Sequence, residues 1–86
     1  MITLIIANGE KFEIEWIGVA SFDGVLRFGI KNADITNLLA TFTKPENCTV
    51  LTRSFDGEEK TFEGYTVFRG ITIDYDGTII VALSKF

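Results

Sequence analysis

The most informative segment of this 86-residue chain reads NGEKFEIEWI, residues 8–17. Within it, Phe12, Ile14 and Trp16 alternate with charged residues, which is the period of a β-strand with one face in the core and one in water. The alternation predicts a strand over 11–17 and a buried Trp16. The preceding Asn8-Gly9 pair predicts a two-residue type I′ hairpin turn, because such a turn needs a positive φ at both central positions.

The same kind of dipeptide recurs along the chain, at Asp23-Gly24, Asp56-Gly57 and Asp76-Gly77. Each pair lies between segments rich in Ile, Val, Thr and Phe, so we expect mainly antiparallel strands joined by tight reversals. Gly64 interrupts one alternating segment and predicts a bulge or a sharp bend. The expected strands cover residues 2–7, 11–17, 26–31, 48–53, 60–68, 71–75 and 79–83.

One segment changes period and predicts a short helix. Asp34 is a good N-cap residue, and Pro45 requires the helix to end before it. The apolar residues between them recur at i, i+3, i+4 and i+7, as in an amphipathic helix; they are Ile35, Leu38, Leu39 and Phe42. Because so short a helix is unstable alone, its apolar stripe is expected to lie on the sheet or to plug one end of a barrel.

These elements predict a single α+β domain over residues 1–86, with six or seven mainly antiparallel strands and one helix after the third strand. The strands are expected to form a bent sheet or a small, partly open barrel. The residues expected to be almost fully buried are Trp16, Phe28, Leu38, Phe42, Ile73 and Val81.

Composition and charge argue against several classes of function. The net charge is −4, and the eight Lys and Arg residues are spread singly, so we expect no nucleic-acid partner. We expect no membrane partner either, because no segment approaches the ~20 apolar residues of a membrane-spanning helix. The chain has no histidine to activate Cys48 or a serine, so no catalytic residue is predicted. We expect a cytoplasmic location.

Two acidic patterns have simpler explanations than a metal or catalytic site. Asp74 to Gly77 is similar to part of a calcium loop, but that register would place Leu83 at the position of the bidentate acid. An acid/base pair could come from the glutamates, which are Glu13, Glu15, Glu58, Glu59 and Glu63. Glu13 and Glu15 instead alternate with core residues and are explained as the wet face of a strand. We therefore predict no metal site and no cofactor.

Candidate interface residues come from two observations. Ile5 and Ile80 lie in segments that are apolar on both faces, so another subunit is expected to cover the second face. Phe22, Phe55 and Tyr65 fall in turns or outside the inward-facing rows, and exposed aromatic area usually marks a partner site. The alternative is that these aromatic residues plug the ends of a small barrel.

Three short runs resemble proteins of one kind. They are Phe42–Asn47, Phe62–Thr66 and Ile71–Asp74. Together they resemble short uncharacterised proteins encoded in phage and prophage regions of Gram-positive bacteria. The resemblance implies a virion or tail-assembly component and a virion location, and it implies no functional residue.

The sequence therefore favours a small, non-enzymatic structural or protein-interaction domain with a protein partner or self-association. One alternative is a module that binds a small ligand or peptide at the barrel mouth or along a sheet edge. The other is an enzyme, for which a buried carboxylate beside a cleft would be the minimum sign.

Overall fold

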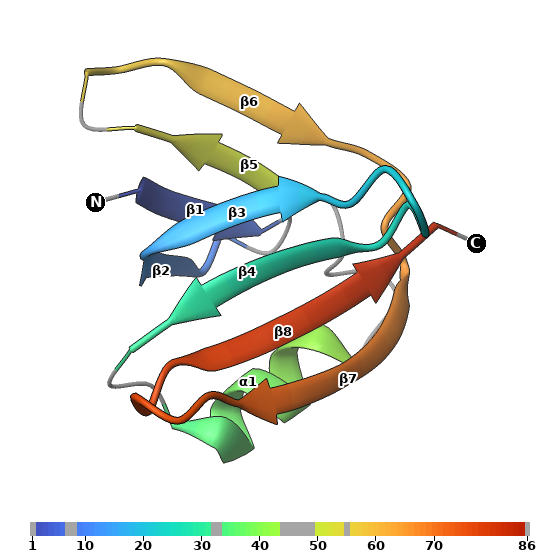
Figure 1. The fold of residues 1–86 in the computed structure, drawn as a ribbon. Coiled ribbons are helices and arrows are strands. Elements are labelled where there is room, and N and C mark those ends of the chain that lie inside the picture. The colour runs from blue at the N-terminus through green and yellow to red at the C-terminus, as the bar shows by residue number, and fades with distance from the viewer. Residues whose placement is uncertain (1, 7–8, 32–33, 44–49, 55, 86) are drawn as a thin grey trace.

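The computed structural model describes residues 2–6, 9–31, 34–43, 50–54 and 56–85, which form eight strands and one short helix (Figure 1). The strands are β1 (Ile2–Ile6), β2 (Lys11–Ile14), β3 (Trp16–Val19), β4 (Leu26–Ile30), β5 (Val50–Arg53), β6 (Glu59–Phe62), β7 (Val67–Ile73) and β8 (Ile79–Ser84). The helix α1 (Ile35–Phe42) follows β4. The α+β class with antiparallel strands is confirmed.

Two four-stranded sheets make up the fold. The first has the order β2-β1-β5-β6 and the second the order β3-β4-β8-β7, with every neighbouring pair antiparallel. Residue 15 alone separates β2 from β3, and residues 63–66 connect β6 to β7, so the chain passes from one sheet to the other at both places. Within the described residues the strands form two separate ladders and not a closed barrel.

The predicted strand over 11–17 divides at Glu15, so the described residues form eight strands. The helix therefore follows the fourth strand and not the third. Ile14 is fully buried in the first sheet, and Glu15 already donates its N–H to the Gly29 carbonyl of the second sheet at 2.8 Å. The bend shifts the alternation by one residue, as at corners where a strand changes sheets. Ile17 therefore faces inward, and the prediction of a buried Trp16 is wrong, since that side chain is 41% exposed.

The chain also passes from β6 in the first sheet to β7 in the second near Gly64, which has a φ of 84°. This confirms the sharp bend expected there. A true bulge lies further on in β7, where the pairing with β8 shifts between Phe68 and Gly70. Gly70 has a φ of 146°, and β7 continues through this bulge where two separate strands were expected.

The turn at Asp76-Gly77 is one residue longer than predicted. Asp74 donates its N–H to the Thr78 carbonyl at 2.8 Å, and Gly77 donates to the Asp74 carbonyl at 3.0 Å, so three residues form the loop. Such a loop needs a positive φ only at its glycine, here 87°, and leaves the Asp76 carboxylate free to accept the Thr78 N–H at 3.0 Å. The same glycine-to-carbonyl hydrogen bond recurs at Gly9 and Gly57. The two-residue type I′ prediction is therefore corrected at Asp56-Gly57 and Asp76-Gly77, whereas Asn8 of the first pair lies outside the described residues.

Helix α1 begins as predicted, because the Asp34 side chain accepts the Thr36 N–H at 2.9 Å. Its inward face carries Leu38 and Phe42, both fully buried, whereas Leu39 at the edge of the stripe is 40% exposed. The helix ends at Phe42, before Pro45, which lies outside the described residues.

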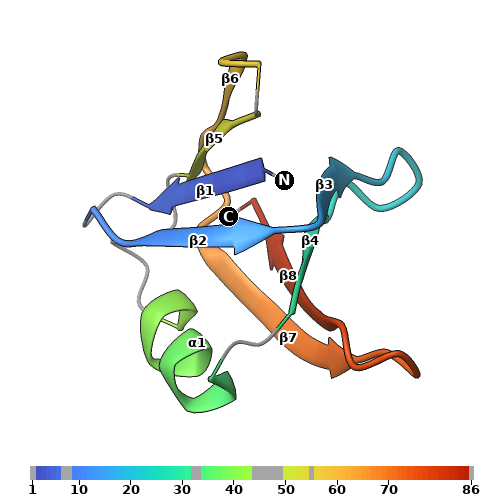
Figure 2. The same cartoon turned by 90° about the vertical axis from the view of Figure 1, so that its left-hand side faces the viewer.

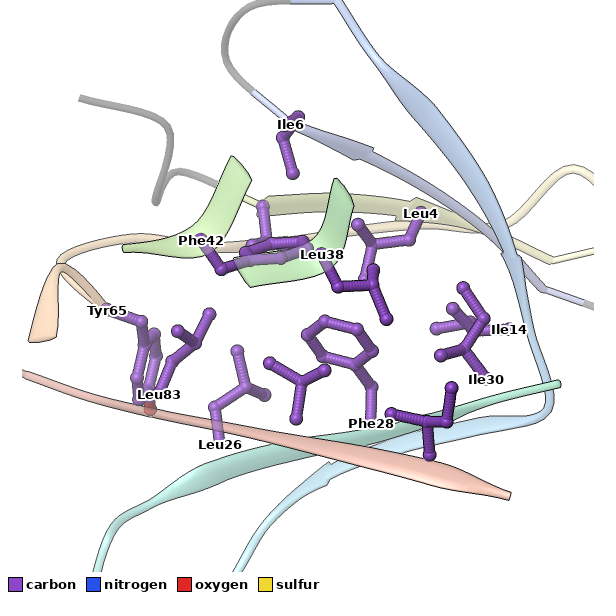
Figure 3. Close-up of a cluster of buried hydrophobic side chains, with 13 residues drawn as sticks. Leu4, Ile6, Ile14, Leu26, Phe28, Ile30, Leu38, Phe42, Tyr65 and Leu83 are labelled. Carbon is purple, nitrogen blue, oxygen red and sulfur yellow. The ribbon is translucent and has the colours of Figure 1, made fainter. Parts of the chain in front are cut away.

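One hydrophobic core joins both sheets and the helix (Figure 3). The ring of Phe42 lies 5.3 Å from that of Phe28 in the second sheet and 5.8 Å from that of Phe12 in the first, measured between ring centroids. The fully buried members are Leu4, Ile14, Leu26, Phe28, Leu38, Phe42, Val50, Val81 and Leu83.

Four of the six residues predicted for the core are fully buried: Phe28, Leu38, Phe42 and Val81. Ile73 is not, and its prediction is corrected, since it is 59% exposed. Ile73 ends β7, a strand that pairs with β8 alone, next to an exposed turn. Because β7 is an edge strand, no further strand covers the Ile73 side chain on its open side, and that side chain stays in solvent.

Candidate interaction surface

The outward face of the second sheet holds a shallow hollow of about 530 Å³, here called the outer hollow. Its lining includes Asp23, Arg27, Arg69, Thr72, Ile80 and Ala82. Figure 1 views this face of β4, β8 and β7, with α1 behind the sheet. The elements that the structure describes therefore leave this face uncovered.

The hollow forms because small residues meet across the sheet. In one transverse row the partners run Gly18, Arg27, Ala82 and Gly70, so three of four positions have no side chain beyond Cβ. The next row contains Gly29 between Trp16 and Ile80. These small residues form a low floor, and the larger side chains of Arg27, Ile80 and Thr72 stand around it.

Trp16 lies against the backbone of Gly29 on this face. A Cβ built at Gly29 would stand 2.7 Å from Cε2 of Trp16, closer than real Cβ atoms approach a neighbour. The indole therefore occupies the space that a side chain at Gly29 would take. Since Trp16 remains 41% exposed, it offers apolar area beside the hollow.

Arg27 is fixed at one side of the outer hollow by Asp23. Their Nη2 and Oδ2 atoms are 2.8 Å apart, and Asp23 also accepts the Val25 N–H at 3.0 Å. The hydrogen bond from Arg27, followed by that from Val25, lowers the pKa of Asp23 below its ordinary value. The Arg27 guanidinium also lies 6.0 Å from the ring centroid of Phe22.

Arg69 approaches the hollow from the other side, out of the β7 bulge. Bulges redirect side chains, and this one leaves Arg69 as the extra residue beside Gly70. Ala82 of β8 separates the two arginine-bearing strands, so their backbones are about 10 Å apart at two strand spacings. Among the described residues, no ion pair or hydrogen bond engages the Arg69 guanidinium.

The predicted interface residues fall in different places. Ile80 lines the outer hollow, and Phe22, at 85% exposure, lies near it beside Arg27. Ile5 is on the outward face of the first sheet, opposite Lys11 and Leu51. The structure does not bring Ile5 and Ile80 onto one surface.

Tyr65 corrects the expectation of an exposed aromatic residue, because it is only 7% exposed and belongs to the core. The Tyr65 ring centroid lies 6.4 Å from that of Phe62 and 5.4 Å from the Lys85 ammonium. The chain bend at Gly64 turns the next residue inward. Phe55 and Cys48 lie outside the described residues.

Sequence reasoning missed Trp16, Arg27 and Arg69 as surface groups of one site. A glycine opposite Trp16 was the available signal, because a residue without Cβ in a strand often marks a close approach. The two arginines gave no signal, since strands far apart in sequence bring them to either side of β8.

A smaller cavity of about 170 Å³ opens between the sheets. Ile2 and Ile17 supply its apolar side, with Thr52 and Lys60 beside them. Thr52 is already engaged, since its hydroxyl lies 3.4 Å from the Lys60 carbonyl.

The acidic groups of the predicted turns bind backbone. Asp74 accepts the Tyr75 N–H at 2.8 Å, as Asp76 accepts that of Thr78. In the part of the chain that the structure describes, no three acidic or cysteine side chains gather as they would around a metal ion. Buried side-chain polar atoms there all have hydrogen-bond partners.

Comparison of the chain with protein-family models, with curated proteins and with solved structures finds no match. Within the described residues, no helix has the length and apolar character needed to cross a membrane.

Proposed function

We propose that this protein is a small, non-enzymatic structural subunit that associates with other copies of itself through the outer hollow and its rim. The observation that carries the proposal is an uncovered sheet face on which Ile80 and Ala82 are only half-buried and Trp16 is 41% exposed. Burial of such apolar area is the main favourable term in protein association.

The two outward faces differ in character, which is why the second sheet is favoured. Around Ile5, the first sheet presents charged residues, which are Lys11, Glu13, Arg53 and Glu59. Charged residues are depleted at interface centres. The second sheet instead offers a floor of small and apolar residues with arginines at its margin, and arginine is enriched in interfaces.

A non-enzymatic role is supported by the chemistry of the chain. It contains no histidine, and the carboxylates with a lowered pKa, those of Asp23, Asp56 and Asp76, accept hydrogen bonds from turn residues. Their charge stabilises hairpins. We further propose that the subunit belongs to a phage-derived particle, on the resemblance of the runs around Phe42 and Gly64 described above.

The second candidate function is a ligand-binding module, favoured by the cavity between the sheets. Ile2 and Ile17 would contact an apolar group and Lys60 a carboxylate. Its volume of about 170 Å³ is below the usual range of ligand pockets, about 300–1,000 Å³, so we place this function second.

The test is Ile80→Lys, with Ile5→Lys as the matched control on the other sheet. Both positions are half-buried and outward-facing. Light scattering over a wide range of concentrations should show self-association of the parent protein, weakened about tenfold or more, or about 1.4 kcal/mol, by Ile80→Lys alone. A parent protein that stays monomeric at every concentration, with an unchanged fold, would contradict self-association.

A further inference from the structure

The outer hollow carries positive charge on an acidic protein. Two arginines and one aspartate line it, whereas the whole chain has a net charge of −4. Asp23 already pairs with Arg27, and Arg69 has no ion-pair partner within the described part of the chain. Two copies meeting face to face would bring these like charges together, which disfavours a symmetric contact. The charge instead favours an acidic occupant.

The same chain presents an acidic segment at the β5–β6 turn. Asp56, Glu58 and Glu59 lie there. Of these three, Glu59 alone has a cationic partner among the residues that the structure describes, namely Arg53 at 3.1 Å. Asp56 accepts hydrogen bonds from the Ser54 hydroxyl and from the Glu58 N–H, the latter at 3.1 Å. These bonds fix the turn and, led by the one from Ser54, lower the pKa of Asp56. Glu58 is exposed, and it also lies at the edge of the smaller cavity between the sheets.

The turn cannot reach the hollow of its own molecule. Strand β6 pairs with β5 alone, and the hairpin extends from the first sheet on the side away from β7 (Figures 1 and 2). Residues 59–61 of β6 are exposed, so the hairpin projects from the body. Contact between turn and hollow is therefore possible only between two copies.

We propose that the β5–β6 turn of one copy docks in the outer hollow of the next, with Glu58 against Arg69. This inference rests on the self-association proposed above, and it names the segment that occupies the outer hollow. Because the two contacting surfaces differ, the contact is head-to-tail. Repetition of such a contact gives a ring where the rotation closes and a filament where it does not.

A charge exchange tests this pairing. Arg69→Glu and Glu58→Arg should each weaken self-association about tenfold or more, measured by sedimentation velocity at low salt. The double variant, Arg69→Glu with Glu58→Arg, should restore association to within about threefold of the parent. Glu63→Arg and Lys11→Glu are matched controls, since both residues are exposed and lie outside the turn and the hollow.

The outcomes distinguish a failure of the turn-in-hollow contact from a failure of the proposed self-association. If Ile80→Lys and Arg69→Glu dissociate the protein but Glu58→Arg does not, the hollow is the interface and the turn is not its occupant. If both single charge variants weaken association and the double variant is no better, the Glu58–Arg69 pairing is wrong. A monomeric parent overturns the inference together with the self-association on which it rests.

Discussion

Gly29 leaves the space in which the Trp16 indole lies. It is a buried strand residue, and a Cβ there would overlap Trp16 and come within 3.1 Å of Cγ2 of Thr78. A side chain at this position would force the indole off the sheet. The absence of a side chain at Gly29 therefore determines where the Trp16 indole lies beside the outer hollow.

At this residue scale we predict that Gly29→Ala destabilises the protein by about 1–3 kcal/mol, the usual cost of overpacking. Gly18→Ala is the control, because a Cβ there meets nothing within 4 Å. Urea unfolding followed by the fluorescence of Trp16 gives both the free energy of unfolding and the altered indole environment. Equal stability of the two variants would show that the indole moves aside without cost.

At the scale of elements, helix α1 joins the core through Leu38 and Phe42, and the Phe42 ring contacts both sheets. Phe42 contacts the ring of Phe12 in β2 and that of Phe28 in β4. The helix thus fills space between the two sheets, which form separate ladders in the part of the chain that the structure describes. Its role is to close the core.

We predict that Phe42→Ala lowers the free energy of unfolding by about 3–5 kcal/mol, because the side chain is fully buried. Leu39→Ala, on the same helix at 40% exposure, should cost about 1 kcal/mol or less. Thermal or urea unfolding compares the two. Similar losses for both variants would show that α1 does not seal the core through Phe42.

The elements also show what the sequence could predict. Local patterns found the helix with its Asp34 cap, the hairpin positions and most of the strands. They failed at Glu15, because no glycine, proline or other turn residue there marks the change of sheet that shifts the alternation. Trp16 was therefore assigned to the wrong face. The outer hollow depends on pairing between distant strands. Ile80, which lines it, was a candidate from the pattern of its own strand, whereas Arg27 and Arg69 gave no local signal.

At the scale of the whole molecule, carboxylates fixed in hairpin turns link stability to pH. The hydrogen bond from the Thr78 N–H, as the first cause, lowers the pKa of Asp76 below 3.8, and Asp23 and Asp56 are lowered by their own partners. A folded-state pKa below the unfolded value means that the stabilisation is present above 3.8. It is lost as the pH falls through the folded value.

We therefore predict that the free energy of unfolding is constant above about pH 5 and falls in the acid range below the ordinary aspartate pKa. Asp76→Asn should lower stability at neutral pH and make the acid decline shallower. Asp74→Asn is the control, since it removes a charge two residues away and keeps the Thr78 hydrogen bond. Urea unfolding at pH 7, 4, 3 and 2 measures these slopes, and parallel slopes for the parent and Asp76→Asn would contradict the prediction.

The bulge at Arg69–Gly70 has a consequence for aggregation. Strand β7 is a seven-residue edge, and a long regular edge is a template on which chains add without limit and form amyloid-like aggregates. The extra residue breaks the regular spacing of the ladder and carries a charge. An incoming strand therefore meets an interrupted register, which opposes indiscriminate pairing along this edge.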